Sequence, residues 1–304
     1  MKRYRVLWKV ALLGILILPG CSQRILEGIG IKTAAPIAED DIEVAEAAEN
    51  ETGQDLEGQI DTGDWITAES AVQLPILMYH SISEGNGLRV PSEEFRSQMA
   101  WLRENGYYTL SPEEAYLVLT ENRMPSEKCV WLTFDDGYTD NYTEAFPILK
   151  ENDMKATVFM IGKSIDKGHH LTENQMLEMS RNGISIESHT INHLELNRMT
   201  AEQQEAEMVQ SKELFDRILD QDTTVLSYPV GRYNEESLRL SEEAGYKMAV
   251  TTEPGGASRD QGMHALHRVR ISPGLSVDGF ASLIEILQII EGGRVISNLF
   301  RKII

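Results

Sequence analysis

The stretch Leu132-Thr133-Phe134-Asp135-Asp136-Gly137-Tyr138 joins an apolar run to a turn that carries two adjacent carboxylates. The run from Val130 to Phe134 is short and apolar, which favours a buried β-strand, and Asp-Asp-Gly is a common turn signal. A second cluster, Ser188-His189-Thr190-Ile191-Asn192-His193, follows another strand-like run, Ile184 to Glu187. In folds that alternate strands and helices, functional side chains gather where the strands end. We therefore expect these carboxylates and histidines to meet at one edge of a sheet.

Strand-like and helical stretches alternate from residue 74 onward. The strand-like runs are Ile76 to His80, Val130 to Phe134, Ala156 to Ile161, Ile184 to Glu187, Val225 to Tyr228, Lys247 to Thr251 and Leu266 to Ile271. The helical stretches are Ser92 to Asn105, Pro112 to Glu121, Asn141 to Asn152, Glu173 to Asn182, Ala201 to Asp220 and Glu235 to Ala244. This alternation predicts a parallel sheet, and seven strands fit an α/β fold: a distorted, incomplete (β/α)7 barrel related to the TIM barrel.

Two imidazoles and one carboxylate are a typical ligand set for a catalytic divalent metal ion. They leave the ion open for a water molecule, which then loses a proton near neutral pH. Histidines four residues apart, such as His189 and His193, can share one ion. A neighbouring carboxylate can take the proton from the water. Each motif alone also fits an ordinary turn or two unrelated histidines, but together they predict a hydrolytic metal site.

Three motifs resemble those of the polysaccharide deacetylases, carbohydrate esterase family four. They are Thr133-Phe134-Asp135-Asp136-Gly137, His189-Thr190-Ile191-Asn192-His193 and Ser227-Tyr228-Pro229-Val230-Gly231-Arg232-Tyr233. The run Pro75-Ile76-Leu77-Met78-Tyr79-His80 is similar to the start of a subset that includes deacetylases of poly-N-acetylglucosamine. The resemblance covers roughly residues 74 to 275.

The resemblance implies a role for each matched residue. Asp135 would be the general base, and Asp136, His189 and His193 would hold the metal. The backbone N–H of Val230 would stabilise the tetrahedral oxyanion together with the ion. The third motif, Tyr228, Pro229, Val230 and Gly231, would bind substrate, and the products would be a free amine on the sugar and acetate.

The sequence departs from the family pattern in its third and fourth motifs. Ser227 stands where many members have an arginine that orients the catalytic aspartate. The poly-N-acetylglucosamine subset usually lacks that arginine, so we do not interpret its absence as inactivation. Arg232, Arg268 or Arg270 could supply the charge, and the sequence does not choose among them. The fourth motif's tryptophan is absent from the region between Tyr246 and Thr252.

The general acid of the family is a histidine near the end of a late strand. His267 is nearest in sequence, but it stands early in its strand-like run, away from the expected site. His80 ends the first strand-like run and is therefore expected on the rim that carries the site. We take His80 as the candidate acid, and a buried histidine bonded to backbone is the alternative.

The N-terminal part is expected to be a targeting segment and a tether. Residues 1–20 combine a basic start with the apolar run Val10 to Leu18, and Leu18-Pro19-Gly20-Cys21 resembles a lipoprotein signal with Cys21 as the lipidated residue. An uncleaved N-terminal anchor is the alternative. Residues 21–73 form an acidic tether, with no Lys or Arg between Thr33 and Asp64, and residues 74–304 form the catalytic domain with a helical tail.

The charge composition limits the classes of molecule that the protein is expected to bind. The chain has 304 residues, 28 Lys and Arg, 48 Asp and Glu, and a formal net charge of -20. Such a protein repels nucleic acid, whereas a glycan that is neutral, or that becomes cationic as amines are freed, is compatible. We expect a monomer, tethered to the membrane through Cys21 and located at the cell surface as a bacterial lipoprotein.

The function expected from the sequence is metal-dependent removal of N-acetyl groups from an extracellular polysaccharide that contains N-acetylglucosamine. The polysaccharide would be an exopolysaccharide or peptidoglycan, and the ion would be zinc, with cobalt, nickel and iron as alternatives because the ligand set binds them all. A catalytically weak glycan-binding protein and an O-acetyl esterase that uses the same metal site are the alternative functions.

Overall fold

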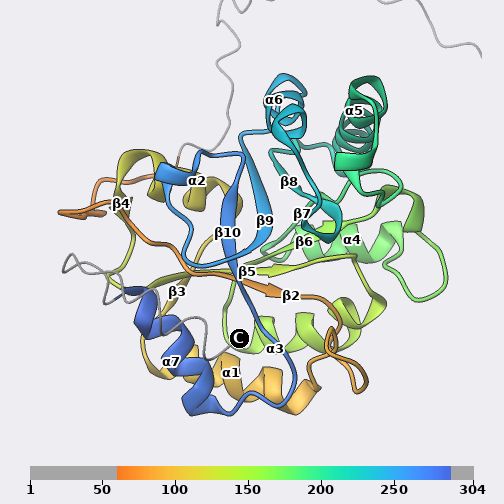
Figure 1. Cartoon of the computed structure of the whole chain (residues 1–304). Coiled ribbons are helices and arrows are strands. Elements are labelled where there is room, and N and C mark those ends of the chain that lie inside the picture. The colour runs from red at the N-terminus through yellow and green to blue at the C-terminus, as the bar shows by residue number, and fades with distance from the viewer. Residues whose placement is uncertain (1–59, 289–304) are drawn as a thin grey trace, which may run out of the picture. The chain divides into compact units, whose positions relative to one another are not determined.

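Seven parallel strands form a closed ring in the computed structural model, which describes residues 60–288 (Figure 1). They are β2 (Ile76–Tyr79), β5 (Cys129–Phe134), β6 (Ala156–Met160), β7 (Ile184–Ser188), β8 (Val225–Ser227), β9 (Met248–Pro254) and β10 (Leu266–Arg270). Around the ring they pair in the order β2, β10, β9, β8, β7, β6 and β5, and β5 pairs with β2 to close it. The predicted (β/α)7 barrel is confirmed, and each barrel strand overlaps one of the seven strand-like runs, with ends that differ by up to three residues.

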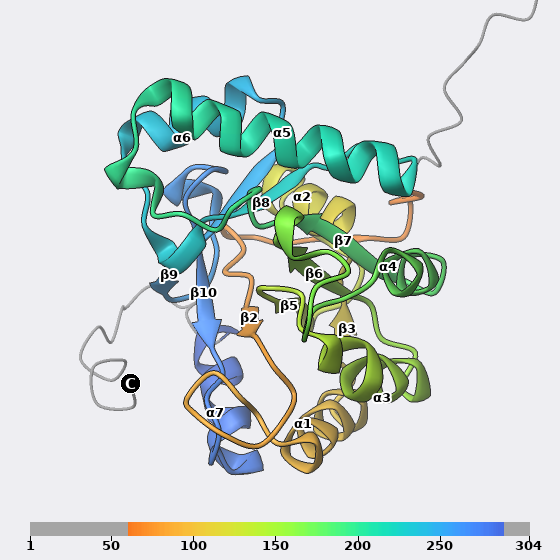
Figure 2. The same ribbon diagram turned by 90° about the vertical axis from the view of Figure 1, so that its right-hand side faces the viewer.

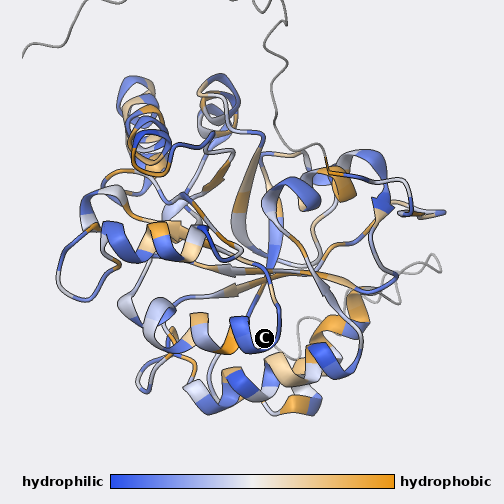
Figure 3. Cartoon of the chain, turned by 180° about the vertical axis from the view of Figure 1, so that it is seen from behind, coloured by the Kyte–Doolittle hydropathy of each residue, from blue (hydrophilic) through white to orange (hydrophobic). Residues whose placement is uncertain are grey.

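Helices surround the ring on its outer side (Figures 1 and 2). Figure 3 shows hydrophilic residues beside hydrophobic ones on them, as expected of helices that bury one face. The signal Ser111-Pro112-Glu113-Glu114 starts a helix as predicted: the Ser111 hydroxyl accepts a hydrogen bond from the Glu114 N–H, and the Glu114 carboxylate accepts one from the Ser111 N–H. The helices are α1 (Ser92–Glu104), α2 (Pro112–Glu121), α3 (Phe146–Glu151), α4 (Glu173–Ser180), α5 (Ala201–Leu219), α6 (Glu235–Glu243) and α7 (Val277–Gln288).

One predicted helix is divided in two. The stretch from Asn141 to Asn152 starts with a π-helical turn, Asn141–Ala145, and continues as α3. Pro147 lies just inside α3, where a residue without an N–H is tolerated only at the start of a helix. The Asn141 side-chain amide donates a 2.7 Å hydrogen bond to the carbonyl of His80. The π-helical turn therefore fixes the backbone at the end of β2.

Alternation along the strands separates two buried clusters. Leu132 and Phe134 of β5 pack outward with residues of α1 and α3, whereas Trp131 packs inside the ring with Phe159 of β6. The Trp131 indole N–H donates a 2.8 Å hydrogen bond to the Thr157 hydroxyl within this interior. Because side chains on a strand alternate between its two faces, β5 directs its odd-numbered residues inward. Asp135, the next odd-numbered residue, therefore enters the barrel at its carboxyl end.

The described part begins before residue 74, the predicted start of the catalytic domain. Strand β1 (Ile66–Thr67) pairs with β4 (Arg123–Met124), and β3 (Tyr108–Thr109) extends the sheet beside β5. Residues 60–73, which composition assigns to the tether, thus contact the barrel domain.

At the C-terminal end of the described residues, α7 packs against α1. The signal segment, Cys21 and residues 289–304 lie outside the described residues. None of the helices between residues 60 and 288 combines the length and apolar character needed to cross a bilayer.

Candidate active site and metal centre

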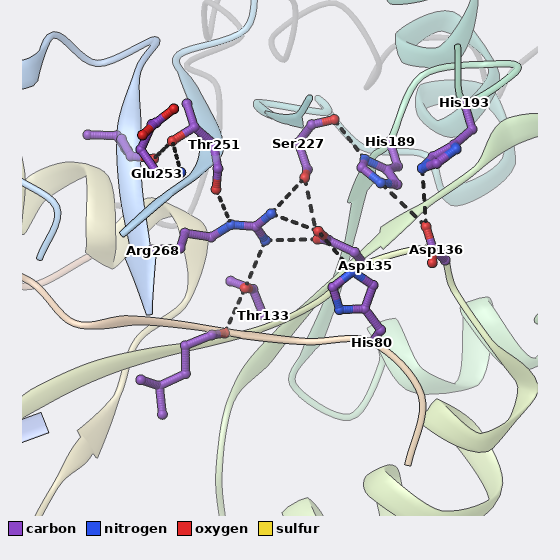
Figure 4. Close-up of polar contacts among 12 residues, drawn as sticks. His80, Thr133, Asp135, Asp136, His189, His193, Ser227, Thr251, Glu253 and Arg268 are labelled. Atoms are coloured by element: carbon purple, nitrogen blue, oxygen red, sulfur yellow. Dashed lines mark hydrogen bonds and ion pairs between the residues drawn. The ribbon is translucent and has the colours of Figure 1, made fainter. Parts of the chain in front are cut away.

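Asp136, His189 and His193 converge at the carboxyl ends of β5 and β7 (Figure 4). Oδ1 of Asp136 lies 3.5 Å from Nε2 of His189 and 3.4 Å from Nε2 of His193. One donor atom from each residue lies within 4.8 Å of the others, a set that could hold a metal ion. The three residues predicted as ligands are therefore brought together by the fold.

The turns that present these ligands have unusual backbone conformations. The φ angles of Asp136, Thr190 and His193 are 73°, 62° and 56°, in the left-handed region that most residues avoid. Each such residue costs roughly 1–3 kcal/mol and persists only where its surroundings hold it. The Thr190 hydroxyl accepts a 3.1 Å hydrogen bond from the His193 N–H, which holds the second histidine in this turn.

The orientation of His189 suits a metal ligand. Its Nδ1 lies 2.7 Å from the carbonyl of Ser227, so Nδ1 carries the proton and donates to that oxygen. Nε2, which lies beside Asp136, then carries the lone pair that could bind an ion. Burial alone would lower the pKa of His189, but the carboxylates of Asp136 and Asp135 outweigh burial and raise it. The same negative potential attracts a divalent cation, so the donor set and its charge fit such an ion.

Asp135 is held apart from this triad by a buried arginine. Nη1 and Nη2 of Arg268 donate to Oδ1 and Oδ2 of Asp135 at 2.8 and 2.7 Å, and the arginine side chain has no exposed surface. The Ser227 hydroxyl also donates to Oδ1 at 3.3 Å. Nε of Arg268 donates to the Thr251 carbonyl and Nη1 to the Thr133 hydroxyl, at 2.7 and 3.2 Å. Among the three candidate arginines, Arg268 therefore contacts the aspartate.

Charge keeps Asp135 ionised. Burial alone would raise its pKa, but the Arg268 guanidinium beside it holds the pKa well below the usual range. A bidentate pair also fixes the plane of the carboxylate, leaving it little freedom to rotate toward the metal ligands.

His80 lies beside the same carboxylate (Figure 4). Its Nε2 is 4.0 Å from Oδ2 of Asp135, and 15% of its side chain is exposed. Burial lowers the pKa of His80, and the positive charges of Arg268 and Arg270 add to this effect, against the opposing charges of Asp135 and Asp136. His267 is on the opposite face of β10 from Arg268, because adjacent residues of a strand point to opposite faces. Of these two histidines, His80 is the one at the site.

The third motif supplies a loop beside the triad. Tyr228 is fully buried, its hydroxyl 3.1 Å from that of Ser241, so its side chain cannot touch a substrate from this position. Pro229 is also buried, whereas Val230 is 56% exposed and has a φ of 56°. A β-branched residue in this conformation is a strained outlier. The loop thus presents Val230 to solvent.

Gly231 makes the conformation of this loop possible. Its φ is 64°, and a Cβ added there would lie 1.9 Å from the hydroxyl oxygen of Thr252. No other residue fits without displacing β9. Thr252 lies in the region where the family's fourth motif places a tryptophan.

The sequence left the role of Arg268 open, although a signal was present. Residues at i and i+2 of a strand share a face, so Arg268 and Arg270 were a pair pointing the same way. The sequence alone did not show whether that face of the strand pointed into the barrel. It also did not show how far along the barrel the two arginines would lie. The Ser227 hydroxyl was noted only as a replacement for arginine, and its hydrogen bonds to Asp135 and Arg268 were not foreseen.

Comparison with known proteins identifies the family. The sequence profile described as polysaccharide deacetylase matches residues 122–249. The chain is 64% identical over 228 residues to the polysaccharide deacetylase YxkH of Bacillus subtilis (strain 168), and the alignment covers 75% of this chain and 82% of that protein. The chain is a member of the polysaccharide deacetylase family. Membership makes it an enzyme of the deacetylase type, which acts on carbon–nitrogen bonds.

A solved deacetylase has the same fold. Streptococcus pyogenes deacetylase PplD, in complex with acetate, is 39% identical and superposes with a TM-score of 0.69 over 71% of this chain and 99% of that one. A more distant relative is the poly-beta-1,6-N-acetyl-D-glucosamine N-deacetylase of Staphylococcus epidermidis. It is 25% identical over 210 residues, which are 64% of this chain and 71% of that protein. The profile match ends before β10, so Arg268 lies outside it.

Proposed function

We propose that this polysaccharide deacetylase removes acetyl groups from N-acetylglucosamine residues of a cell-surface polysaccharide and requires one divalent metal ion. The observation that carries the proposal is the separation of two adjacent carboxylates into two environments. Asp136 lies with two histidines, and Asp135 is held by Arg268. Neighbouring acids in different surroundings are typical of a site that divides metal binding from proton transfer.

Asp136, His189 and His193 would hold the ion. When bound, a divalent ion acidifies water and polarises an acetyl carbonyl. The ion would be zinc, and cobalt, nickel and iron suit the same ligands.

Groups of the protein itself would carry out proton transfer and stabilise the oxyanion. Asp135 stays ionised and accepts a proton at the oxygen that faces His80. His80 is mostly neutral at pH 7 because its pKa is lowered, so its Nε2 can take that proton and deliver it to the nitrogen of the leaving sugar. Arg268 orients Asp135, and the N–H of Val230 would donate to the oxyanion of the acetyl group. Val230, with Gly231 behind it, would border the bound sugar.

The substrate and location follow from the relatives and from the N-terminal sequence. The Staphylococcus epidermidis relative named above points to a polymer of N-acetylglucosamine, and peptidoglycan carries the same acetamide. The signal-like residues 1–20 and Cys21 support an enzyme anchored outside the cytoplasm by lipid. The acidic segment after Cys21 would let the catalytic domain reach polysaccharide at some distance from the membrane.

Acetate release tests the function. The purified full chain is incubated with N-acetylglucosamine oligomers and with peptidoglycan, with added zinc or with chelator, beside the variants Asp135→Asn and His80→Gln. We expect metal-dependent acetate from the parent chain, at least a hundredfold less from Asp135→Asn, and a smaller loss from His80→Gln, as is typical of proton-transfer residues.

Arg239→Gln is the matched control, because Arg239 pairs with Glu236 and Glu243 on the exposed face of α6, away from the site. Acetate release that is insensitive to chelator, or unchanged in Asp135→Asn, would overturn the proposed mechanism. Glycan binding without any acetate would favour a binding protein, and release only from O-acetylated sugars would favour an esterase.

A further inference from the structure

A second arginine stands at the mouth of the barrel, directly after the one that holds Asp135. Arg270 is two residues beyond Arg268 on β10, so both belong to the same face of the strand. Two residues advance a parallel strand by about 6.6 Å toward its carboxyl end. Arg268 is buried with its guanidinium on Asp135, whereas Arg270 is exposed. Its strand pairing places it level with Met78 of β2, and Met78 is level with Thr133 of β5, two residues before Asp135.

Pairing within the sheet locates Arg270 beside His80. Arg270 is opposite Met78 of β2, two residues before His80. The charge of Arg270 also lowers the pKa of His80, which puts the guanidinium within electrostatic range of the site. Both observations place Arg270 on the His80 side of the opening.

No carboxylate within residues 60–288 comes within 4 Å of the Arg270 guanidinium. The nearest acids of the site are already engaged: Asp135 by Arg268, and Asp136 by the two histidines. Glu253 is the second-last residue of β9, and its charge acts on Tyr233 and His267. Arg270 thus offers its donors to solvent.

A second guanidinium is fixed on the loop that follows His80. Nη1 of Arg89 donates to the Ser83 hydroxyl at 3.2 Å, and Ser83 in turn contacts the Ser81 hydroxyl. Ser81 donates to Asp140, so this loop is tied to the segment that follows Tyr138. Burial and Asp136 raise the pKa of Tyr138, and the charge of Arg89 partly opposes this rise. Glu84 is the exposed acid of this loop, and it makes no ion pair with Arg89.

Exposed arginines at the opening contrast with the charge of the whole chain, which has 48 acidic and 28 basic side chains. A local positive potential on an acidic protein attracts an anion to that place and repels it elsewhere. Guanidinium groups match carboxylate and phosphate oxygens with two parallel hydrogen bonds.

We propose that Arg270 receives an anionic substituent of the glycan, and that Arg89, on the loop that follows His80, adds to the positive potential of that rim. The preferred substrate is then an N-acetylhexosamine polymer that bears a carboxylate or a phosphate beside the acetylated sugar, rather than a neutral polymer. This inference rests on the proposed function and narrows its substrate class.

Three substrates of matched length test the inference. They are a neutral N-acetylglucosamine tetramer, a peptide-free peptidoglycan tetrasaccharide with lactyl carboxylates, and an N-acetylglucosamine oligomer that ends in a phosphodiester. For the parent chain, we expect a KM for one anionic substrate about three- to tenfold below that for the neutral tetramer, the effect of one partly exposed charge pair. Arg270→Gln should remove this difference, and Arg270→Lys should restore part of it.

Arg259→Gln is the matched control, since Arg259 is an exposed arginine in the segment before β10, at the opposite end of the barrel. Salt adds a second readout: the KM for the anionic substrate should rise with ionic strength in the parent chain and much less in Arg270→Gln. Comparing the KM for the carboxylate-bearing substrate with the KM for the phosphate-bearing substrate shows which anion is recognised. Equal KM values for all three substrates, or an equal loss on the neutral tetramer in Arg270→Gln, would overturn the inference.

Binding separates this inference from the proposed function. Calorimetric titration of the same glycans into the Asp135→Asn chain, with and without Arg270→Gln, measures recognition without turnover. Tighter binding of an anionic glycan that depends on Arg270 supports the inference even if the parent chain releases no acetate. Binding that is equal for neutral and anionic glycans contradicts it, whatever the activity.

Discussion

At the scale of single residues, Asp135 and Arg268 are the most consequential pair. The guanidinium is fully enclosed and the carboxylate nearly so, with two hydrogen bonds joining them. A buried ion pair does not by itself stabilise a fold, because both charges lose their hydration. Removing one partner, however, leaves the other charge buried and unpaired. The pair therefore makes catalytic geometry and folding depend on the same two residues.

Arg268→Gln should lower the free energy of unfolding by about 3–5 kcal/mol, because it leaves the buried Asp135 carboxylate without a counter-charge. The double variant Asp135→Asn with Arg268→Gln should recover part of the loss, since it removes both charges. Chemical denaturation measures both. Arg239→Gln, on an exposed pair, should leave stability nearly unchanged. A double variant as unstable as the sum of its single changes would show that the two residues do not act as a pair.

Glu187 predicts a pH dependence of stability. It is 3% exposed, and its Oε2 accepts hydrogen bonds from the N–H groups of Thr224 and Val225 at 2.9 and 2.7 Å. Burial raises its pKa well above the usual 4.5, although the N–H of Val225 works against this. Between 4.5 and that higher pKa, the folded chain holds a proton that the unfolded chain has lost. Its contribution to stability therefore declines as pH rises through this range.

Glu187→Gln should remove this decline, because the amide keeps an oxygen for the N–H groups and carries no charge. The variant should match the parent near pH 4 and have the higher Tm at pH 7. Thermal unfolding across pH 4 to 8 measures this, with the exposed Glu213→Gln as the control. Parallel Tm profiles for the parent chain and Glu187→Gln would contradict the assignment.

At the scale of elements, the barrel strands could be predicted and the smallest pieces could not. The barrel strands have three to seven residues, and some of them, such as β2 and β5, are almost entirely apolar and stand out from their surroundings. Strands β1, β3 and β4 have two residues each and carry no periodicity. The π-helical turn before α3 is followed by Pro147, and its first residue, Asn141, donates to the carbonyl of His80, just after β2. Contacts with distant parts of the chain, rather than local sequence, determine the conformation of these short elements.

The loop after β8 yields a prediction about Gly231. Gly231→Ala should reduce both Tm and acetate release, because the new methyl group would overlap Thr252. Gly262→Ala is a matched control: its φ is 82°, but nothing lies within 4 Å of the added carbon. The control bears only the conformational cost, roughly 1–2 kcal/mol, so the difference between the variants isolates the overlap. Thr252→Gly should rescue Gly231→Ala, and equal Tm losses in the two alanine variants would refute the overlap.

At the scale of the whole molecule, a bound ion should stabilise the fold. An ion at a hundred times its Kd raises the free energy of unfolding by about 2.7 kcal/mol if it binds only the folded chain. Zinc should therefore raise Tm in the parent chain and in Asp135→Asn, and chelator should reverse the shift. Asp136→Asn and His189→Gln should show little or no shift. A zinc shift lost in Asp135→Asn but kept in Asp136→Asn would reverse the roles assigned to the two carboxylates.

The site as a whole was only partly visible in the sequence. Asp136, His189 and His193 belong to compact motifs, so local spacing was enough to group them. Arg268 reaches Asp135 across the barrel, and its selection depends on strand register and on the position of β10 in the ring. A sequence gives neither of these directly, which is why three arginines remained open and only the structure chose one.

Closure of the ring bears on when the enzyme becomes active. Asp135 and Arg268 are 133 positions apart, and β10 enters between β9 and β2 as the last strand of the barrel. During synthesis, a ribosome releases the metal-binding motifs well before it releases this arginine. Contacts between such distant segments form late, because closing long loops is slow. A nascent chain would therefore carry all three candidate metal ligands while Asp135 still lacks Arg268. The enzyme would be inactive until its last barrel strand, β10, has been synthesised.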